Sequence, residues 1–277
     1  MTKPRTVAGY DRAYVTKVRA TCLYLATKLG DILDELVIVG GLVPSLIIDQ
    51  TSGNLEKHVG TLDLDVGMQV AILDNRRYEE LTARLRAADF GPDTNDKGTP
   101  TRQRWKIDGP PKVTIDFLIP ASRAGDRGGG LRDIEADFAA VIAPGLRLAF
   151  LDSAKVTLEG RTIRDEQARR EITVCGAGAF VAMKAMALRG RGENKDAHDL
   201  VYVLRNFGDG PAAVAARLQP LMDQPEAQEA MRYLTEDFET VAHLGPRRAA
   251  EFLHGGLHED AQADAWGAVR DLLERLK

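Results

Sequence analysis

The alternation of apolar and polar residues predicts helices and short buried strands in the first part of the chain. Residues 10–29 repeat apolar positions with the period of an amphipathic helix, and residues 35–41 (ELVIVGG) predict a short buried strand that ends in a glycine pair. Residues 42–50 and 74–91 predict helices. The second of these has Asp74 as its expected N-cap and Gly91 just past its end.

Alternation with a period of two marks further segments as strands. Residues 61–70 (TLDLDVGMQV) predict one strand, and residues 101–107 and 112–119 predict a hairpin joined by DGPP. Residues 92–100 and 123–133 predict loops, and further strands are expected at 154–159 and 171–175. From residue 177 the pattern is helical to the end. The sequence therefore predicts an α/β (α+β) domain over residues 1–175 and a helical domain over 176–277.

Length and composition fit a soluble globular protein of one or two domains. The 277 residues are 44% hydrophobic, which is enough for a buried core, and two unpaired-looking cysteines favour a reducing compartment. The N-terminus has no apolar signal region, and the longest apolar run, 36–48, is shorter than the ~20 residues of a membrane helix. We therefore expect a cytoplasmic protein that does not enter membranes. Residues 161–195 have an excess of basic residues, which indicates either a phosphate-binding surface or an ordinary solvated face.

Two aspartates interrupt the strand predicted at 61–70. Asp63 and Asp65 are two residues apart, so they project from one face of the strand, while Leu64 and its apolar neighbours face the core. Asp116 has a similar position in the strand predicted at 112–119. If the two strands are neighbours, three carboxylates converge, and such a group can hold two Mg²⁺ ions roughly 3.5–4 Å apart for nucleotidyl transfer. The alternative is that each aspartate simply faces solvent.

Two other features suit a phosphate-bearing ligand. Gly40-Gly41 lies between a predicted strand and a predicted helix, where the backbone can approach a phosphate, although the chain contains no P-loop motif. Lys184 is the only charged residue of the apolar segment 177–188, so it either extends to water or meets an anion such as a nucleoside triphosphate. Farther on, Asp196 is expected to be a helix N-cap, and Asp199 to pair with Lys184 or Lys195.

Three of these motifs, taken in their order along the chain, resemble those of the nucleotidyltransferase superfamily of the DNA polymerase β type. They are the Gly40-Gly41 turn, the DLD of residues 63–65 and Asp116. The segment 183–200 (MKAMALRGRGENKDAHDL) is similar to that of AbiEii-type abortive-infection nucleotidyltransferases, the toxins of type IV toxin–antitoxin systems. That family has a lysine helix followed by a K-D-x-x-D-L segment. The resemblance covers about residues 36–205, and its specificity comes from the order of short motifs.

The resemblance implies a nucleotidyltransferase fold, with a mixed β-sheet flanked by helices and a C-terminal helical region. It implies Mg²⁺-dependent transfer of a nucleotide from an NTP such as ATP. By matched position, the metal ligands would be Asp63, Asp65 and Asp116, and Asp116 would also accept the proton of the attacking hydroxyl. Gly40 and Gly41 would hold the β- and γ-phosphates, Lys184 would contact the triphosphate, and Asp199 would be a further catalytic candidate.

The acceptor is left open by the residues themselves. Relatives in the AbiEii-type group add nucleotides to tRNA 3′ ends, so the resemblance implies an RNA acceptor and a cognate antitoxin partner. Arg102, Arg104 and Lys106, on one face of their strand, also favour a polyanion. A protein or a small molecule is the alternative acceptor. As an alternative to an enzyme, the chain is a catalytically inactive nucleotide-binding module.

Two rival motifs predict other chemistry. The sequence around Gly176 and Gly178 resembles a dinucleotide fingerprint, but Val181 stands where the third small residue belongs. His254 and His258 have the spacing of zinc ligands on a helix, but the Gly-Gly between them favours a helix boundary.

Overall fold

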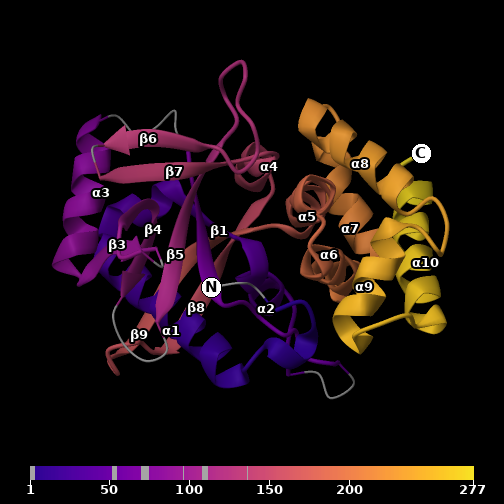
Figure 1. Cartoon of the computed structure of the whole chain (residues 1–277), viewed down its shortest axis with the longest axis horizontal. Coiled ribbons are helices and arrows are strands. Elements are labelled where there is room, and N and C mark those ends of the chain that lie inside the picture. The colour runs from indigo at the N-terminus through magenta and orange to yellow at the C-terminus, as the bar shows by residue number, and fades with distance from the viewer. Residues whose placement is uncertain (1–3, 52–54, 70–74, 96, 108–111, 136) are drawn as a thin grey trace. The chain divides into compact units, whose positions relative to one another are not determined.

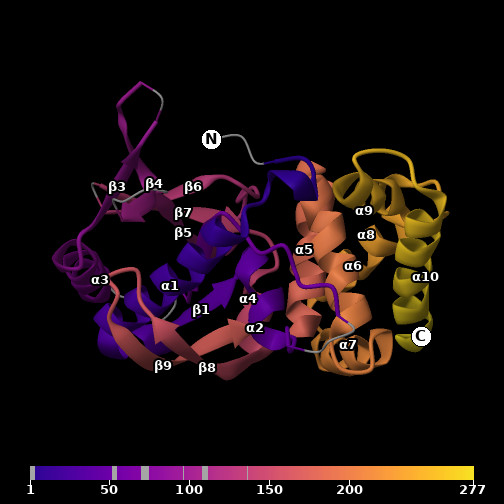
Figure 2. The ribbon, with the colours of Figure 1, turned by 90° about the horizontal axis from the view of Figure 1, so that it is seen from below.

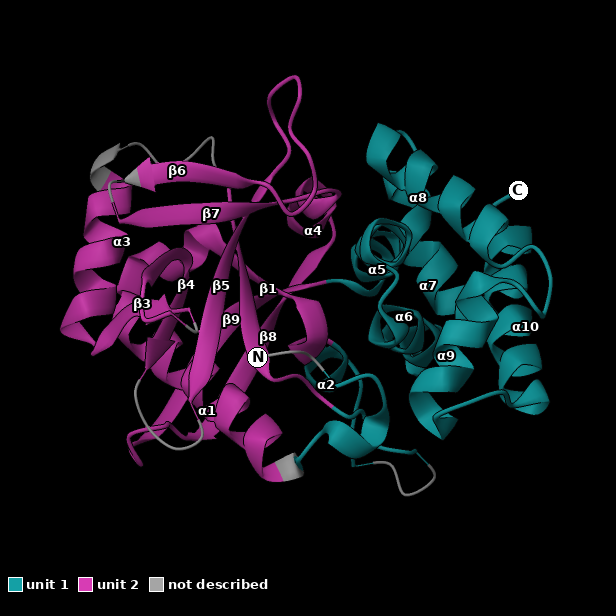
Figure 3. Ribbon diagram, viewed as in Figure 1, with its two compact units in different colours: residues 1–11, 44–59, 176–277 teal, residues 12–43, 60–175 magenta. Residues whose placement is uncertain are grey.

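The computed structural model describes residues 4–51, 55–69, 75–95, 97–107, 112–135 and 137–277. Two compact units make up the chain (Figure 3). The sheet unit comprises residues 12–43 and 60–175, and the helical unit comprises residues 1–11, 44–59 and 176–277. The segments 1–11 and 44–59 thus cluster with the C-terminal helices. The expected domains, 1–175 and 176–277, stay a prediction.

In the sheet unit, nine strands within the described ranges form one mixed sheet (Figure 1). Its main order is β3-β4-β5-β2-β1-β9-β8, and β7 pairs with both β5 and β6. β2 is parallel to β5 and antiparallel to β1. The strands are β1 Leu36–Val39, β2 Asp63–Met68, β3 Phe90–Thr94, β4 Pro100–Ile107, β5 Val113–Pro120, β6 Leu131–Glu135, β7 Phe138–Ala143, β8 Ser153–Arg161 and β9 Gln167–Cys175.

Helices accompany this sheet, which confirms the expected α/β fold class with a mixed sheet flanked by helices. They are α1 Arg12–Leu29, α3 Asn75–Ala87 and α4 Leu146–Leu151, and a 3₁₀ segment, Gly30–Glu35, follows α1. α1 covers the apolar face of the sheet, where its Tyr24 ring packs against Phe90 at a centroid distance of 5.9 Å. α4 lies on the other face, because Leu146 packs directly over Gly67 of β2.

The core of the sheet unit follows from the alternation of its strands. In β5 every second residue from Val113 is buried and the intervening ones are half-buried. The buried rings of Trp105 and Phe117 both pack edge-on against Phe138, at 5.8 and 5.3 Å. Burial of these large side chains on one face fixes the register of the strands, since a slip of one residue would turn them to the opposite face. The same register fixes which polar residues face the other way.

The helical unit contains the C-terminal helices that the sequence predicts. They are α5 Ala177–Arg191, α6 Asn194–Asn206, α7 Pro211–Leu218, α8 Pro225–Asp237, α9 Leu244–His254 and α10 Glu259–Arg275. α5 and α6 lie side by side (Figure 1, Figure 2), and α6 packs against α9. The shorter elements are the 3₁₀ segments Val7–Gly9 and Gln219–Leu221 and the helix α2 Pro44–Ile47. None of the helices in the described part of the chain is long and apolar enough to span a membrane.

Several predicted elements differ in extent. The helix expected at 42–50 is a 3₁₀ turn, Gly40–Leu42, followed by the single turn of α2, because the Asp49 carboxylate accepts the Thr51 N–H and turns the chain. α3 ends at Ala87, since Asp89 adopts a positive φ of 61°, so Gly91 belongs to β3 instead of ending the helix. The expected loops 92–100 and 123–133 contribute residues to β3 and β6. Asp74 and the DGPP turn lie outside the described residues.

Candidate functional site

The first group of candidate residues lies on β2. Asp63 and Asp65 project from one face of the strand, whereas Leu64 and Val66 are fully buried on the other. Asp63 is only 5% exposed, so its carboxylate is not an ordinary solvent-facing group. The Thr61 hydroxyl donates a 2.8 Å hydrogen bond to Asp63 Oδ1 and fixes its orientation. The simple reading of two solvated strand residues is therefore wrong for Asp63.

Asp116 joins the pair from the neighbouring strand. In the parallel pairing of β2 and β5, Asp65 lies opposite Asp116, and Asp63 lies opposite Thr114. A carboxylate oxygen from each of Asp63, Asp65 and Asp116 lies within 4.8 Å of the others. The expected convergence of three carboxylates is thus present in the fold. Oxygen donors of this kind are the ligands that Mg²⁺ prefers, so the three side chains fit a magnesium centre.

Arg104 stands beside this carboxylate triad on the next strand. It lies opposite Asp116 in the antiparallel pairing of β4 and β5. Its Nε donates to Asp116 Oδ1 at 2.7 Å, and its Nη2 donates to Oδ2 at 2.6 Å, the fork geometry of a strong arginine–carboxylate pair. The hydrogen bonds to Asp116 raise the pKa of Arg104, against the effect of its partial burial, and the charges of Asp63 and Asp65 act in the same direction.

Gly40 closes the triad from the end of β1. Val39, the last residue of β1, lies opposite Asp65, and Gly40 then turns the chain with a φ of +71°. A Cβ atom at Gly40 would lie 1.9 Å from Asp65 Oδ2, so only glycine leaves room for this carboxylate. Gly41 is buried in the same turn. The helix that follows, α2, is a single turn, so the backbone of the glycine turn, and not a helix dipole, is what this segment offers to a phosphate.

Tyr14 of α1 belongs to the surroundings of Asp63. Its hydroxyl donates to the backbone oxygen of Lys112. Burial raises the pKa of Tyr14, the charge of Asp63 raises it further, and Arg104 acts in the opposite direction. The raised pKa keeps the phenol protonated, so Tyr14 adds no charge to the surroundings of Asp63.

The second group of candidate residues lies in the helical unit. Lys184 of α5 is buried, and its Nζ donates to Asp196 Oδ1 at 2.9 Å and to Asp199 Oδ2 at 2.7 Å, both on α6. Lys184 therefore does not extend to water, and the expected pairing with Asp199 is confirmed. The prediction that Asp196 is an N-cap is wrong. α6 begins at Asn194 after Glu193, which places Asp196 in the first turn, where Lys184 and Arg191 hold it.

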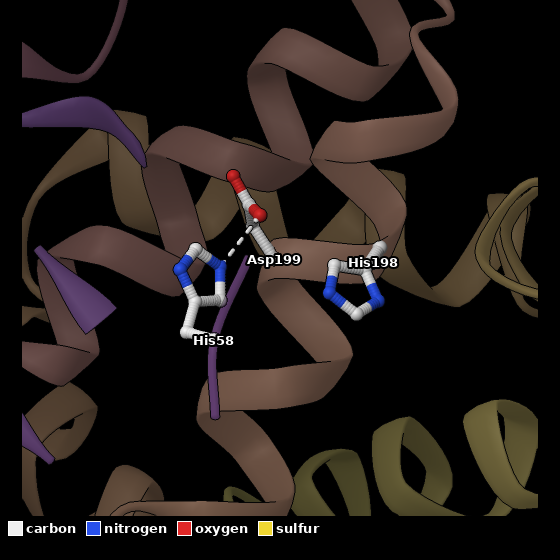
Figure 4. A group of neighbouring side chains, drawn as sticks. All are labelled: His58, His198 and Asp199. Carbon is white, nitrogen blue, oxygen red and sulfur yellow. Dashed lines mark hydrogen bonds and ion pairs between the residues drawn. The ribbon is translucent and has the colours of Figure 1, made fainter. Parts of the chain in front are cut away.

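Asp199 is the most heavily bonded carboxylate of this network. Besides Lys184, it accepts from Lys195 Nζ, at 2.7 and 2.8 Å, and from His58 Nε2 at 2.9 Å (Figure 4). Burial alone would raise the pKa of Asp199, but Lys184 and Lys195 hold it well below its usual range. For Lys184, burial would lower the pKa, but Asp196 and Asp199 raise it. The lysine and the two aspartates are therefore all charged.

Two histidines border Asp199. His58 and His198 have nearly parallel rings 5.9 Å apart, and Figure 4 shows them on either side of the Asp199 carboxylate. Burial lowers the pKa of His198 to about 3, and it lowers the pKa of His58 despite the hydrogen bond to Asp199. Both rings are therefore neutral. His58, His198 and Asp199 lie close enough together to share a metal ion, but Lys184 and Lys195 already supply the cationic partners of Asp199.

The predicted site residues thus fall into two groups. Gly40, Gly41 and the three aspartates come together in the sheet unit, and Lys184 and Asp199 come together in the helical unit. Sequence reasoning missed Thr61 and Tyr14. It noted Arg104 as a polyanion contact but missed its pairing with Asp116, because the predicted hairpin ends align Ile107 with Lys112, whereas the structure aligns Ile107 with Val113.

The rival motifs have structural roles in the described residues. Gly178 packs so closely on the backbone of Arg217 that an added Cβ would lie 2.8 Å from its carbonyl carbon, which accounts for a small residue there without a dinucleotide. α9 ends at His254 and α10 begins at Glu259, so the predicted helix boundary is confirmed. His258 accepts the Ala261 N–H as the N-cap of α10.

Comparison with known proteins finds similarity among solved structures. The chain matches no protein-family model and no curated protein. Among solved structures, it is similar to the crystal structure of an antigenic nucleotidyltransferase-like protein from Paracoccidioides brasiliensis. The TM-score is 0.43 and the sequence identity 17%, over 79% of this chain and 88% of that chain. A likeness at this level assigns neither a family nor an activity, and the AbiEii-type resemblance stays a prediction.

Proposed function

We propose that the protein is a Mg²⁺-dependent nucleotidyltransferase that moves a nucleoside monophosphate from an NTP to an acceptor hydroxyl. The observation that carries the proposal is the register of β2 and β5, which brings Asp63, Asp65 and Asp116 together beside a glycine turn shaped around Asp65. Gathering three carboxylates costs free energy unless cations compensate their repulsion. A bound divalent cation would compensate this repulsion, and the arrangement therefore supports a divalent-cation centre.

In this proposal Asp63, Asp65 and Asp116 hold Mg²⁺, which supplies charge stabilisation to the transferred phosphoryl group. The acceptor oxygen forms a bond to the α-phosphorus, the bond between the α-phosphorus and the bridging oxygen breaks, and pyrophosphate leaves. Asp116 takes the proton of the acceptor hydroxyl. The backbone of Gly40 and Gly41 holds the β- and γ-phosphates, because glycine lets a phosphate approach the main chain.

Lys184 and Asp199 have linked roles in the proposal. The Lys184 ammonium has three N–H donors and gives two of them to Asp196 and Asp199. We propose that a triphosphate oxygen accepts a hydrogen bond from the same ammonium. Asp199 then acts as a positioning residue, because it holds the ammonium of Lys184 and not the substrate.

For the acceptor, we propose an RNA 3′ end such as that of tRNA, with the protein acting as a toxin. The resemblance to AbiEii-type nucleotidyltransferases supports this part. The strand face with Arg102 and Arg104 supports it less than its sequence suggests, because Arg102 pairs with Asp133 and Arg104 with Asp116. A protein or small-molecule acceptor would use the same chemistry.

The test incubates the protein with Mg²⁺, each α-labelled NTP, total RNA and total protein, and follows the label. Label in RNA that disappears with EDTA and with Asp65→Asn supports the proposal. Label in protein or in a small molecule would show that the proposed RNA acceptor is wrong and would still support the transferase activity. Absence of transfer with every NTP and acceptor, together with NTP binding by calorimetry, would identify an inactive binding module. For the toxin role, growth arrest on expression must require Asp65.

A further inference from the structure

Arg104 occupies a position that the proposed transferase chemistry does not yet use. It lies at the same level of the sheet as the carboxylate triad, since the registers align Val39, Asp65, Asp116 and Arg104 across β1, β2, β5 and β4. This alignment is fixed by the backbone pairing of four adjacent strands. Strand pairing therefore places Arg104 beside the carboxylate triad in the same way as it places Asp65 and Asp116.

The guanidinium engages both oxygens of Asp116. Its two hydrogen bonds, of 2.7 and 2.6 Å, use one acceptor position on each oxygen. A cation bound by Asp116 would have to share an oxygen with the guanidinium or displace it from one. In both cases the positive charge of Arg104 opposes the binding of the cation.

The charges of the centre lead to the same conclusion. Three carboxylates and one guanidinium carry a net charge of −2, which one divalent cation balances. Without Arg104 the charge would be −3, and the attraction for a divalent cation would be greater. The Arg104 side chain is 34% exposed, whereas that of Asp116 is 13% exposed, so the guanidinium has access to solvent while the carboxylate stays in place.

We infer that Arg104 is an internal counter-ion of the carboxylate triad, which neutralises Asp116 in the metal-free protein and competes with divalent cations for it. The inference rests on the proposed metal centre and adds a residue that sets its affinity. Arg104 thereby keeps the triad compact without a metal and weakens divalent-cation binding.

The same strand offers a matched control. Arg102 is two residues away on the same face of β4, is 43% exposed, and pairs with Asp133 of β6 at 2.9 Å instead of with the triad. Arg102→Gln removes the same charge from the same strand without releasing Asp116. A difference between the two variants therefore reports the contact with Asp116 and not the net charge of the surface.

The experiment titrates Mn²⁺ into the full-length protein without nucleotide and measures free Mn²⁺ by electron paramagnetic resonance. We expect Arg104→Gln to bind Mn²⁺ about tenfold more tightly than wild type, and Arg102→Gln to bind within about twofold of it. Arg104→Lys keeps the charge but loses the fork, so its affinity should lie between wild type and Arg104→Gln. In EDTA, Arg104→Gln should melt at a lower temperature than wild type, and Mn²⁺ should reverse the loss.

The outcomes separate this inference from the proposed function. If wild type binds Mn²⁺ and loses it with Asp65→Asn, the metal centre stands; equal or weaker binding by both Arg104 variants would then overturn the counter-ion role. If Arg104→Gln does not fold, Arg104→Lys decides, because tighter binding than wild type supports competition and equal or weaker binding refutes it. If no variant binds Mn²⁺, the metal centre itself is wrong, and the inference fails with it.

Discussion

Asp65 and Asp116 face each other across the parallel strands β2 and β5, at the level where β1 ends. Replacing the Asp65 carboxylate by an amide removes a negative charge from a group of three that repel one another and leaves the Asp116–Arg104 pair in place. We expect Asp65→Asn to lower nucleotidyl transfer by about 10³-fold or more, since metal-ion charge stabilisation contributes several kcal/mol. The melting temperature without metal should not fall. Full activity in the variant would show that Asp65 holds no catalytic cation.

Gly40 should tolerate no side chain. In Gly40→Ala, the new Cβ meets Asp65 Oδ2 and the backbone has a φ of +71°, so both the carboxylate and the turn must shift. Gly98→Ala is the matched control, because Gly98 has a φ of +77° and no atom within 4 Å of its added Cβ. Both variants carry a backbone penalty of roughly 1–2 kcal/mol. We expect only Gly40→Ala to weaken Mn²⁺ binding; equal effects would mean that the contact with Asp65 is unimportant.

Lys184→Met should destabilise the protein strongly. The change leaves Asp196 and Asp199 buried without the ammonium that bonds both, and breaking a buried ion pair on one side costs about 3–5 kcal/mol. The control is Lys155→Met, which removes a surface pair with Asp34 and should cost less than about 1 kcal/mol. Urea denaturation at neutral pH measures both. A similar small loss for the two variants would contradict the buried network.

His198 should make the protein sensitive to acid. Its pKa is lowered by burial to about 3, so between pH 6.5 and 3 the unfolded chain binds a proton that the native protein does not. The free energy of unfolding should therefore have its full value above pH 6.5. Below that pH it should fall by up to about 1.4 kcal/mol per pH unit. His198→Phe should remove this part of the slope and keep the packing against Phe252, while His58 still contributes.

The measurement is the free energy of unfolding by urea between pH 7.5 and 4.5. His254→Phe, which replaces an exposed histidine, is the control for the substitution itself. An unchanged slope in His198→Phe would show that His198 titrates alike in the folded and unfolded chain.

The sequence predicted the carboxylate centre well because strand geometry is local. A period of two places Asp63 and Asp65 on one face, and the apolar residues around Asp116 assign its face in the same way. The pairing of Arg104 with Asp116 is determined less well, because the predicted hairpin ends align Ile107 with Lys112, whereas the structure aligns Ile107 with Val113. The sequence is sufficient for the face on which a strand residue lies and not for the exact register of two strands.

Other parts of the fold have no such signal. β3 and β6 lie in segments rich in Gly, Pro and Asp, and they become strands because β4 and β7 offer them backbone partners. The single turn of α2 depends on the Asp49 side chain, which local periodicity does not reveal. The bond between His58 and Asp199 joins residues 141 positions apart, so neither motif nor spacing could have indicated it.

The long sequence separation of His58 and Asp199 means that the two residues leave the ribosome at different times. The helical unit contains residues 1–11 and 44–59, which leave the ribosome early, and α6, which leaves late. During vectorial synthesis the sheet unit has all of its strands once residue 175 has emerged, whereas His58 has no Asp199 to bond until α6 follows. All residues of the carboxylate centre have therefore emerged before Asp199, the partner of His58.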